Sequence, residues 1–154
     1  MGYDVTTGWT TQSLKGPGVK VHFALIADTA NFSTDGKLNI IGLFNTVYVP
    51  SLPATHLQMR LIVQYIIEPS DIGAARHLVI HFRDPDGAEL FGIESTEPIR
   101  TSSPLGLTVP QVADIQLLRF EKYGEHTFAV EIDGVELATV PLRVAPLDER
   151  SAEA

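Results

Sequence analysis

The alternation of apolar and polar residues with a period of two is the feature that most restricts the fold of this chain. Every second side chain is apolar in residues 19–25, and residues 57–67 and 77–82 repeat the spacing. Successive side chains of a strand point to opposite faces, so this spacing predicts half-buried β-strands. The best helical candidate is a single turn within residues 69–76 that starts at Ser70.

Eight segments have the composition and length of strands. They are residues 19–25, 37–49, 57–67, 77–82, 89–95, 112–120, 126–132 and 135–144. Short strands separated by turn signals are typical of sandwiches, so we expect an all-β, antiparallel β-sandwich with Greek-key connections and little or no helix. Pro141 has no backbone N–H to donate, which predicts that the last strand is an edge or is bulged there.

One domain with two tails is expected. A chain of 154 residues that is 44% hydrophobic is long and apolar enough to bury a single core. Strand-like sequence fills residues 19–144, so residues 1–18 are expected to be an extended N-terminal tail and residues 145–154 a C-terminal tail.

Asp-Gly dipeptides end three of the connections, and each is either a turn or part of a metal loop. Asp133-Gly134 stands between two strand-like segments and predicts a two-residue hairpin. Residues 84–87 (Asp-Pro-Asp-Gly) fit a type I turn, and Asp35-Gly36 ends a looser loop. A calcium loop needs more carboxylates at alternating positions. We therefore expect Asp35, Asp86 and Asp133 to serve backbone geometry and to bind no metal.

Charge and cysteine content exclude several functions. A net charge of −8 repels phosphate backbones, so no nucleic-acid partner is expected. The absence of Cys excludes disulfides, thiolate metal sites and a Cys nucleophile. The N-terminus has neither the basic nor the apolar region of a signal peptide, and no apolar run is long enough to span a bilayer. The expectation is a cytoplasmic protein with no membrane partner, with assembly into a particle left open.

Five histidines offer the main candidates for chemistry. His77 and His81 share a face of one strand, but four residues place them roughly 13 Å apart. They are expected to be surface side chains, while a site built across strands with His22 or His126 is left open.

Catalytic motifs give no support for an enzyme. The chain has no G-x-S-x-G elbow, G-x-G-x-x-G fingerprint or P-loop. Glu94 and Glu97 have the chemistry of a glycosidase pair, but nothing in the sequence fixes their geometry. We expect no catalytic residue, no cofactor and no small-molecule substrate.

Four segments together resemble a known family. They are "FALIADTANFSTDGKLNIIGLFN" (23–45), "LPATHLQM" (52–59), "RDPDG" (83–87) and "GEHTFAVEIDGVELATVPLRV" (124–144). The chain is similar in them to small bacterial proteins with no assigned function, which implies an immunoglobulin-like sandwich and carries over no functional residue. His126 stands where such sandwiches commonly have the Tyr of a tyrosine corner, so that hydrogen bond is in doubt here.

Surplus apolar residues predict an interface. Ile62 and Ile66 lie on the otherwise polar side of one strand, and Ile41 and Leu43 lie opposite the apolar side of another. A sandwich has one core, so these residues need a second cover: the Pro-rich segment 97–110, the N-terminal tail or another subunit. We favour a subunit contact, with Trp9 of the tail as a further candidate.

The function most consistent with these observations is a non-enzymatic interaction or structural module that binds a protein partner or itself. One alternative is a surface or accessory subunit of a larger particle, such as a virion, anchored by its N-terminal tail. A weaker alternative is a carbohydrate-binding or hydrolytic sandwich, for which Tyr48 and Tyr123 are the aromatic candidates.

Overall fold

The computed structural model describes residues 18–100 and 107–153, and nearly all of its regular structure is β-strand. The strands are β1 (Lys20–Phe32), β2 (Leu38–Phe44), β3 (Thr46–Val49), β4 (Ala54–Ile66), β5 (Leu78–Arg83), β6 (Glu89–Ser95), β7 (Thr108–Phe120), β8 (Gly124–Ile132) and β9 (Val135–Pro146). A 3-10 turn, η2 (Pro69–Asp71), and a short helix, α1 (Leu147–Glu153), complete the described elements. Neither has the length and apolar character needed to cross a bilayer.

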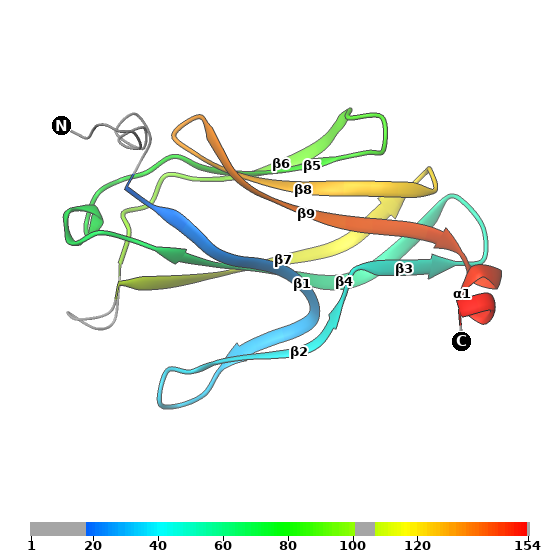
Figure 1. Ribbon diagram of the computed structural model, residues 1–154, viewed down its shortest axis with the longest axis horizontal. Coiled ribbons are helices and arrows are strands. Elements are labelled where there is room, and N and C mark those ends of the chain that lie inside the picture. Colours follow the sequence, from blue (N-terminus) through cyan, green and yellow to red (C-terminus); the bar gives the residue numbers. More distant parts are fainter. Residues whose placement is uncertain (1–17, 101–106, 154) are drawn as a thin grey trace, which may run out of the picture.

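Two sheets pack face to face, as Figure 1 shows. The first has the strand order β2-β1-β4-β7, and the second has the order β3-β9-β8-β5-β6. All neighbouring strands are antiparallel except β3 and β9, which are parallel. The predicted all-β sandwich is confirmed, with nine strands among the described residues in place of about eight.

Apolar side chains from both sheets form one core. Phe120 of β7 in the first sheet meets Phe82 of β5 in the second, with ring centroids 6.4 Å apart. Phe128 of β8 lies 4.5 Å from Phe82, and all three rings are fully buried. The aromatic contacts therefore join the two sheets between β7, an edge strand, and β5, which lies next to the edge strand β6.

Residues 37–49 form two strands in place of the single strand expected. The chain leaves the first sheet after Phe44 and enters the second at Thr46, so β2 and β3 belong to different sheets. β3 presents buried Val47 and Val49 to the interior, whereas in β2 only Phe44 packs against the core. The change of sheet therefore explains only part of the apolar pattern on both faces of this segment.

The Asp-Gly turns have the predicted geometry. Ile132 pairs with Val135, and Asp133 (φ 50°) and Gly134 (φ 83°) both have positive φ, as a two-residue hairpin requires. Asp133 also accepts a hydrogen bond from the N–H of His77 at 2.9 Å, which ties the hairpin to the start of β5.

The turn between β5 and β6 relies on its first acid. Gly87 N–H donates to the carbonyl of Asp84 at 2.9 Å, as in a type I turn. The buried carboxylate of Asp84 accepts the N–H groups of Asp86 and Ala88 at 2.8 and 3.0 Å. Asp84, the first residue of the predicted turn, thus organises it through its carboxylate, while the exposed side chain of Asp86 pairs with Lys122.

The remaining connections refine three expectations. The helical turn expected from Ser70 is η2, whose buried Asp71 accepts from Arg76 at 2.6 Å. At the C-terminal end, β9 continues to Pro146 and α1 follows, within the segment expected to be a tail. Pro141 pairs with Thr127 of β8 on one side, and the pairing of β9 with β3 on the other side begins only at Arg143. In the described ladders, β9 is therefore an edge strand at Pro141, which is one of the two predicted alternatives.

Candidate interaction sites

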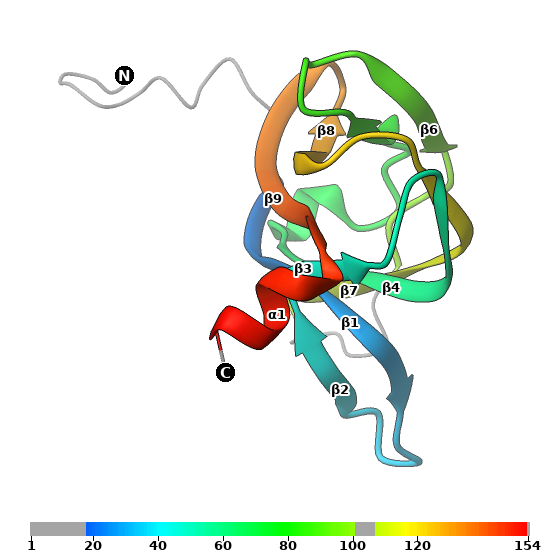
Figure 2. The same cartoon turned by 90° about the vertical axis from the view of Figure 1, so that its right-hand side faces the viewer.

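The β1–β2 hairpin projects from the body of the sandwich, and Figure 2 shows its tip extending away from the other strands. We call residues 28–43 of this hairpin the arm. Its tip is closed by hydrogen bonds between Ser33 and Lys37 and between Gly36 and Ser33. Among the described elements, β2 packs extensively only on β1. The arm therefore has little tertiary support.

Both faces of the arm carry apolar side chains. Ala30 pairs with Ile40 and Phe32 with Leu38 on one face, while Ile41 lies across from Thr29 on the other. The exposed fractions are 52% for Phe32, 56% for Ile41 and 65% for Leu43. A two-stranded ribbon has no interior in which to bury both faces, so these side chains remain open to a partner.

The free edge of β2 has no charged residue. Leu38–Phe44 reads Leu-Asn-Ile-Ile-Gly-Leu-Phe, whereas the edge strand β6 has Glu89 and Glu94 near its ends. Exposed edge strands are normally protected by charges or Pro, because unpaired backbone groups recruit other strands. β2 contains neither a charged residue nor Pro, and its Gly42 (φ 77°) leaves the space that the carboxylate of Asp28 occupies.

The interface candidates from the sequence are only partly brought together. Ile41 and Leu43 lie on the arm, but Ile62 is fully buried and Ile66 is 39% exposed. Ile62 belongs to a central strand, where Leu25 and Val112 flank it on the neighbouring strands, and it is already covered within one copy of the chain.

Ile66 is separated from the arm. It pairs with Lys20, while Ile41 pairs with Thr29, nine residues or about 30 Å along β1. Trp9 lies outside the described residues. Phe32 was not predicted as an interface residue because the expected first strand stopped at Leu25. Its position as an aromatic residue directly before the Asp35-Gly36 turn could have indicated that the strand continues to it.

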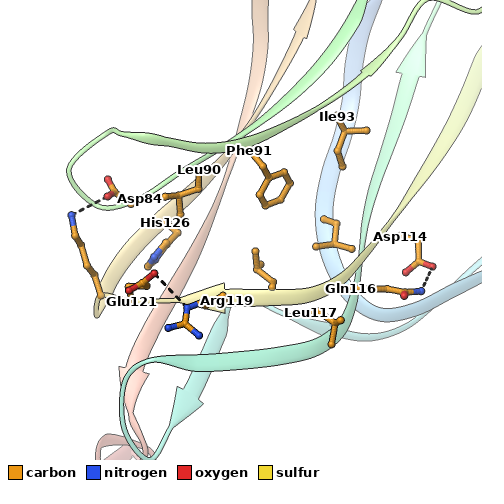
Figure 3. Close-up of a pocket in the computed structure, with 13 residues that line it drawn as sticks. Asp84, Leu90, Phe91, Ile93, Asp114, Gln116, Leu117, Arg119, Glu121 and His126 are labelled. Atoms are coloured by element: carbon orange, nitrogen blue, oxygen red, sulfur yellow. Dashed lines mark hydrogen bonds and ion pairs between the residues drawn. The ribbon is translucent and has the colours of Figure 1, made fainter.

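A cleft of about 630 Å³ opens between β6 and β7, the edge strands on the same side of the two sheets. In Figure 3, Leu90, Phe91 and Ile93 of β6 lie on one side and Leu117 of β7 lies on the other. The lining also includes buried Ile115 and Leu118. The cleft is therefore apolar inside, with charged residues such as Arg119 and Lys122 around it.

His126 provides a polar group to this apolar lining. It is only 1% exposed and stacks on Phe82 with the ring centroids 5.6 Å apart and the planes 13° apart. Burial lowers the pKa of His126 and keeps the ring neutral. Its Nδ1 lies 3.3 Å from the carbonyl oxygen of Gly124, a local backbone bond at the position where a tyrosine corner was in doubt.

A salt-bridge pair closes one end of the cleft. Lys122 Nζ lies 2.9 Å from Asp84 and 2.6 Å from Asp86. The hydrogen bond from Lys122, followed by the backbone bonds of the turn, lowers the pKa of Asp84. The pair anchors the β5–β6 turn to the segment between β7 and β8.

His81 of β5 and His77, just before β5, are bonded to surface carboxylates. His81 lies between Glu89 (2.6 Å) and Glu131 (3.0 Å), and His77 lies 2.8 Å from Glu94. Burial alone lowers the pKa of His81, but the bonds to both carboxylates outweigh it and raise that pKa. Within the described residues, no three His, Asp or Glu side chains are arranged to hold a metal ion.

The glycosidase pairing of Glu94 with Glu97 has no counterpart in the described contacts. The carboxylate of Glu94 is bonded to His77, while the backbone N–H of Glu97 is bonded to Ser95. Of the two aromatic candidates for a carbohydrate site, Tyr123 is 41% exposed and Tyr48 is half-buried.

A family model described as "Family of unknown function (DUF6941)" matches residues 22–145. No curated protein matches the chain. Solved structures with a similar arrangement include an immunoglobulin-like protein from Pseudomonas aeruginosa, at 15% identity and a TM-score of 0.43, covering 82% of this chain and 95% of that one. The strand topology of the chain itself shows the all-β sandwich that the sequence predicted.

Two further solved structures are similar to this chain. One is the Pseudomonas fluorescens alkylpurine DNA glycosylase AlkC bound to DNA, at 10% identity and a TM-score of 0.45, covering 86% of this chain. This chain spans only 32% of the glycosylase. The other is the C-terminal domain of wzt, at 12% identity and a TM-score of 0.49, covering 84% of this chain and 74% of that one.

Proposed function

The chain belongs to the family of unknown function DUF6941, and we propose that it acts as a non-enzymatic self-association module. Its arm pairs with the arm of a second copy and joins the two first sheets into one. The observation that carries the proposal is the uncharged free edge of β2, flanked by exposed Ile41 and Leu43.

The self-complementary geometry of the β2 edge favours a second copy as the occupant. Two copies that each carry a net charge of −8 repel one another over most of their surfaces. No residue of β2 itself is charged, so its edge is a surface on which they can meet with less charge repulsion. An antiparallel pair of β2 strands about a two-fold axis is also self-complementary, as a symmetric dimer requires.

The histidine–carboxylate pairs make His81 unsuited to general-base chemistry. A general base needs an imidazole nitrogen that is free to accept a proton from a substrate. Both nitrogens of His81 are engaged by carboxylates, and Nε2 of His77 is engaged by Glu94. These side chains act as cross-strand ion pairs on the outer face of the second sheet.

Sedimentation equilibrium of the wild type and of Leu43→Glu tests the proposal. The wild type is expected to be a dimer that Leu43→Glu converts to a folded monomer. Leu57→Glu is the matched control, because Leu57 is 73% exposed but lies outside the arm. A monomeric wild type at high concentration, or equal dissociation by the control, would contradict the proposal.

A further inference from the structure

Alternate backbone groups of β2 point away from β1, its only neighbour among the described strands. The N–H of Ser33 donates to the carbonyl of Lys37 at 2.9 Å, so these two residues form a hydrogen-bonded pair. Hydrogen-bonded and non-hydrogen-bonded pairs alternate along an antiparallel ladder. Two residues beyond Lys37, the backbone groups of Asn39 therefore point toward β1 again, whereas those of Leu38 and Ile40 face the free edge.

Two glycines limit the regular part of this edge. Gly36 (φ 88°) and Gly42 (φ 77°) have the positive φ that an extended strand does not use. Gly42 is also the one residue of β2 that the register with β1 skips. Residues 37–41 lie between the two glycines without a positive φ, and Asn39 is at their centre.

One two-fold register uses the whole of residues 37–41. The outward-facing backbone groups of Leu38 and Ile40 must meet outward-facing groups of the second copy. A two-fold axis beside Asn39 pairs Leu38 of each copy with Ile40 of the other and keeps all of 37–41 in the ladder. An axis one residue to either side would bring a glycine into the ladder after a single residue.

This register also places like side chains together on both faces. On one face, Leu38 and Ile40 of the two copies meet, with Phe32 beside Leu38 on β1. On the other face, Asn39 lies opposite Asn39 of the second copy. That pair is non-hydrogen-bonded in its backbone, the kind in which opposite side chains are closest.

The amide of Asn39 has unused hydrogen-bonding groups in a single copy. Its Nδ2 donates to Oδ1 of Asn31 at 3.1 Å. A primary amide has two N–H donors and a carbonyl acceptor, so one N–H and Oδ1 are left over. No other described residue bonds to them. An amide that lies opposite its own copy can donate to it and accept from it, so the two sets of groups match.

We propose that Asn39 sets the register of the paired arms by bonding to Asn39 of a second copy, with the two-fold axis between the two amides. This inference rests on the proposed self-association of the arms and specifies which residues meet. A single polar amide among apolar residues can fix a register, because shifted alignments leave the amide without its counterpart.

Disulfide cross-linking of single-cysteine variants tests the register, since the chain has no cysteine of its own. Asn39→Cys places two thiols in a directly opposite pair, with Cα atoms about 4.5 Å apart and within reach of a disulfide. Ile41→Cys is the matched control, exposed on the same face. Its two copies lie four residues apart along the ladder, about 13 Å. Oxidation should link Asn39→Cys about tenfold faster, because Cα atoms more than about 7 Å apart are not bridged without backbone movement.

Sedimentation equilibrium of the wild type separates the two proposals. If the wild type is a dimer and Ile41→Cys links as fast as Asn39→Cys or faster, the register is overturned while the association stands. A dimeric wild type with no linking of either variant refutes the register equally. A monomeric wild type refutes the association and the register together.

Charge complementation tests the same contact without oxidation. Asn39→Asp and Asn39→Lys each place like charges opposite one another, so either variant alone should associate several-fold more weakly than the wild type. An equal mixture of the two should regain the association, because residue 39 of one variant then meets the opposite charge. A mixture that associates no more tightly than either variant alone would show that Asn39 does not face its own copy.

Discussion

Nδ1 of His81 lies 2.6 Å from Oε1 of Glu89, and the same imidazole reaches Glu131 on its other side. Gly92 and Ala129 pair with His81 on the neighbouring strands, so small residues flank the ring. The acidic partners favour the charged imidazolium, and this relationship makes part of the stability of the fold depend on pH.

The pKa of His81 in the folded state is expected to lie above its ordinary value of 6.5. A raised pKa means that the folded state binds more protons between 6.5 and the folded pKa. The stabilisation is therefore complete below about pH 6.5 and is lost as the pH rises through the folded pKa. The free energy of unfolding of the wild type and of His81→Gln should be measured with urea from pH 6 to 9. The advantage of the wild type over the variant should shrink as the pH rises. An advantage that stays constant or grows would refute the prediction.

An NMR titration separates His81 from His126 in one experiment. Burial lowers the pKa of His126, so its resonances should titrate below 6.5 while those of His81 titrate above it. The opposite order would mean that the carboxylate pairs on the surface are not formed in solution.

Gly134→Val should destabilise the fold by about 1 kcal/mol or more, because a β-branched residue resists positive φ. The position has φ 83° and open space where a Cβ would stand, so the cost arises from the backbone alone. Gly134→Asn is the control, since Asn tolerates this region, and should cost clearly less by thermal unfolding. Equal losses would point to a different turn.

Asp84→Ala should lower the melting temperature by roughly 3 °C or more, and Asp86→Ala by clearly less. Asp84 is buried and bonds to two backbone N–H groups and to Lys122, while the side chain of Asp86 is 74% exposed. Calcium should shift neither value. A calcium-dependent rise that Asp86→Ala abolishes would show that the turn acids hold a cation.

Ile62→Glu should unfold the protein or cost about 3 kcal/mol or more, because it buries an unpaired charge at a fully buried position. Ile41→Glu places the same charge on a side chain that is 56% exposed and should leave the monomer folded. Circular dichroism with urea unfolding compares them. A stable Ile62→Glu variant would mean that the outer face of β4 is open, as the sequence had suggested.

Much of the fold could be predicted because alternation and turn chemistry are local. Asp133-Gly134 fixes its hairpin within two residues, and the strands around it follow at the expected places. The passage of the chain from one sheet to the other near Asn45 was not predicted. Apolar residues on both faces of 37–49 are compatible with one fully buried strand and equally with two shorter strands.

The candidate sites depend on pairings between distant segments. Ile62 and Ile66 lie on the same face of one predicted strand and cannot be told apart in the sequence. In the structure, β4 lies between β1 and β7, and Ile62 is buried while Ile66 is partly exposed. The cleft likewise joins β6 to β7, and His126 becomes part of it because Phe82 and Phe120 fix its ring from two sheets.

Amide hydrogen exchange across a range of protein concentrations tests the central proposal, pairing of the arms, most directly. If β2 pairs with β2 of a second copy, amides of Leu38–Phe44 should gain protection as the concentration rises, and Leu43→Glu should abolish the gain. If those amides exchange at the same rate at every concentration, or if the gain appears on β7 instead, the arm is not the surface through which the chain associates.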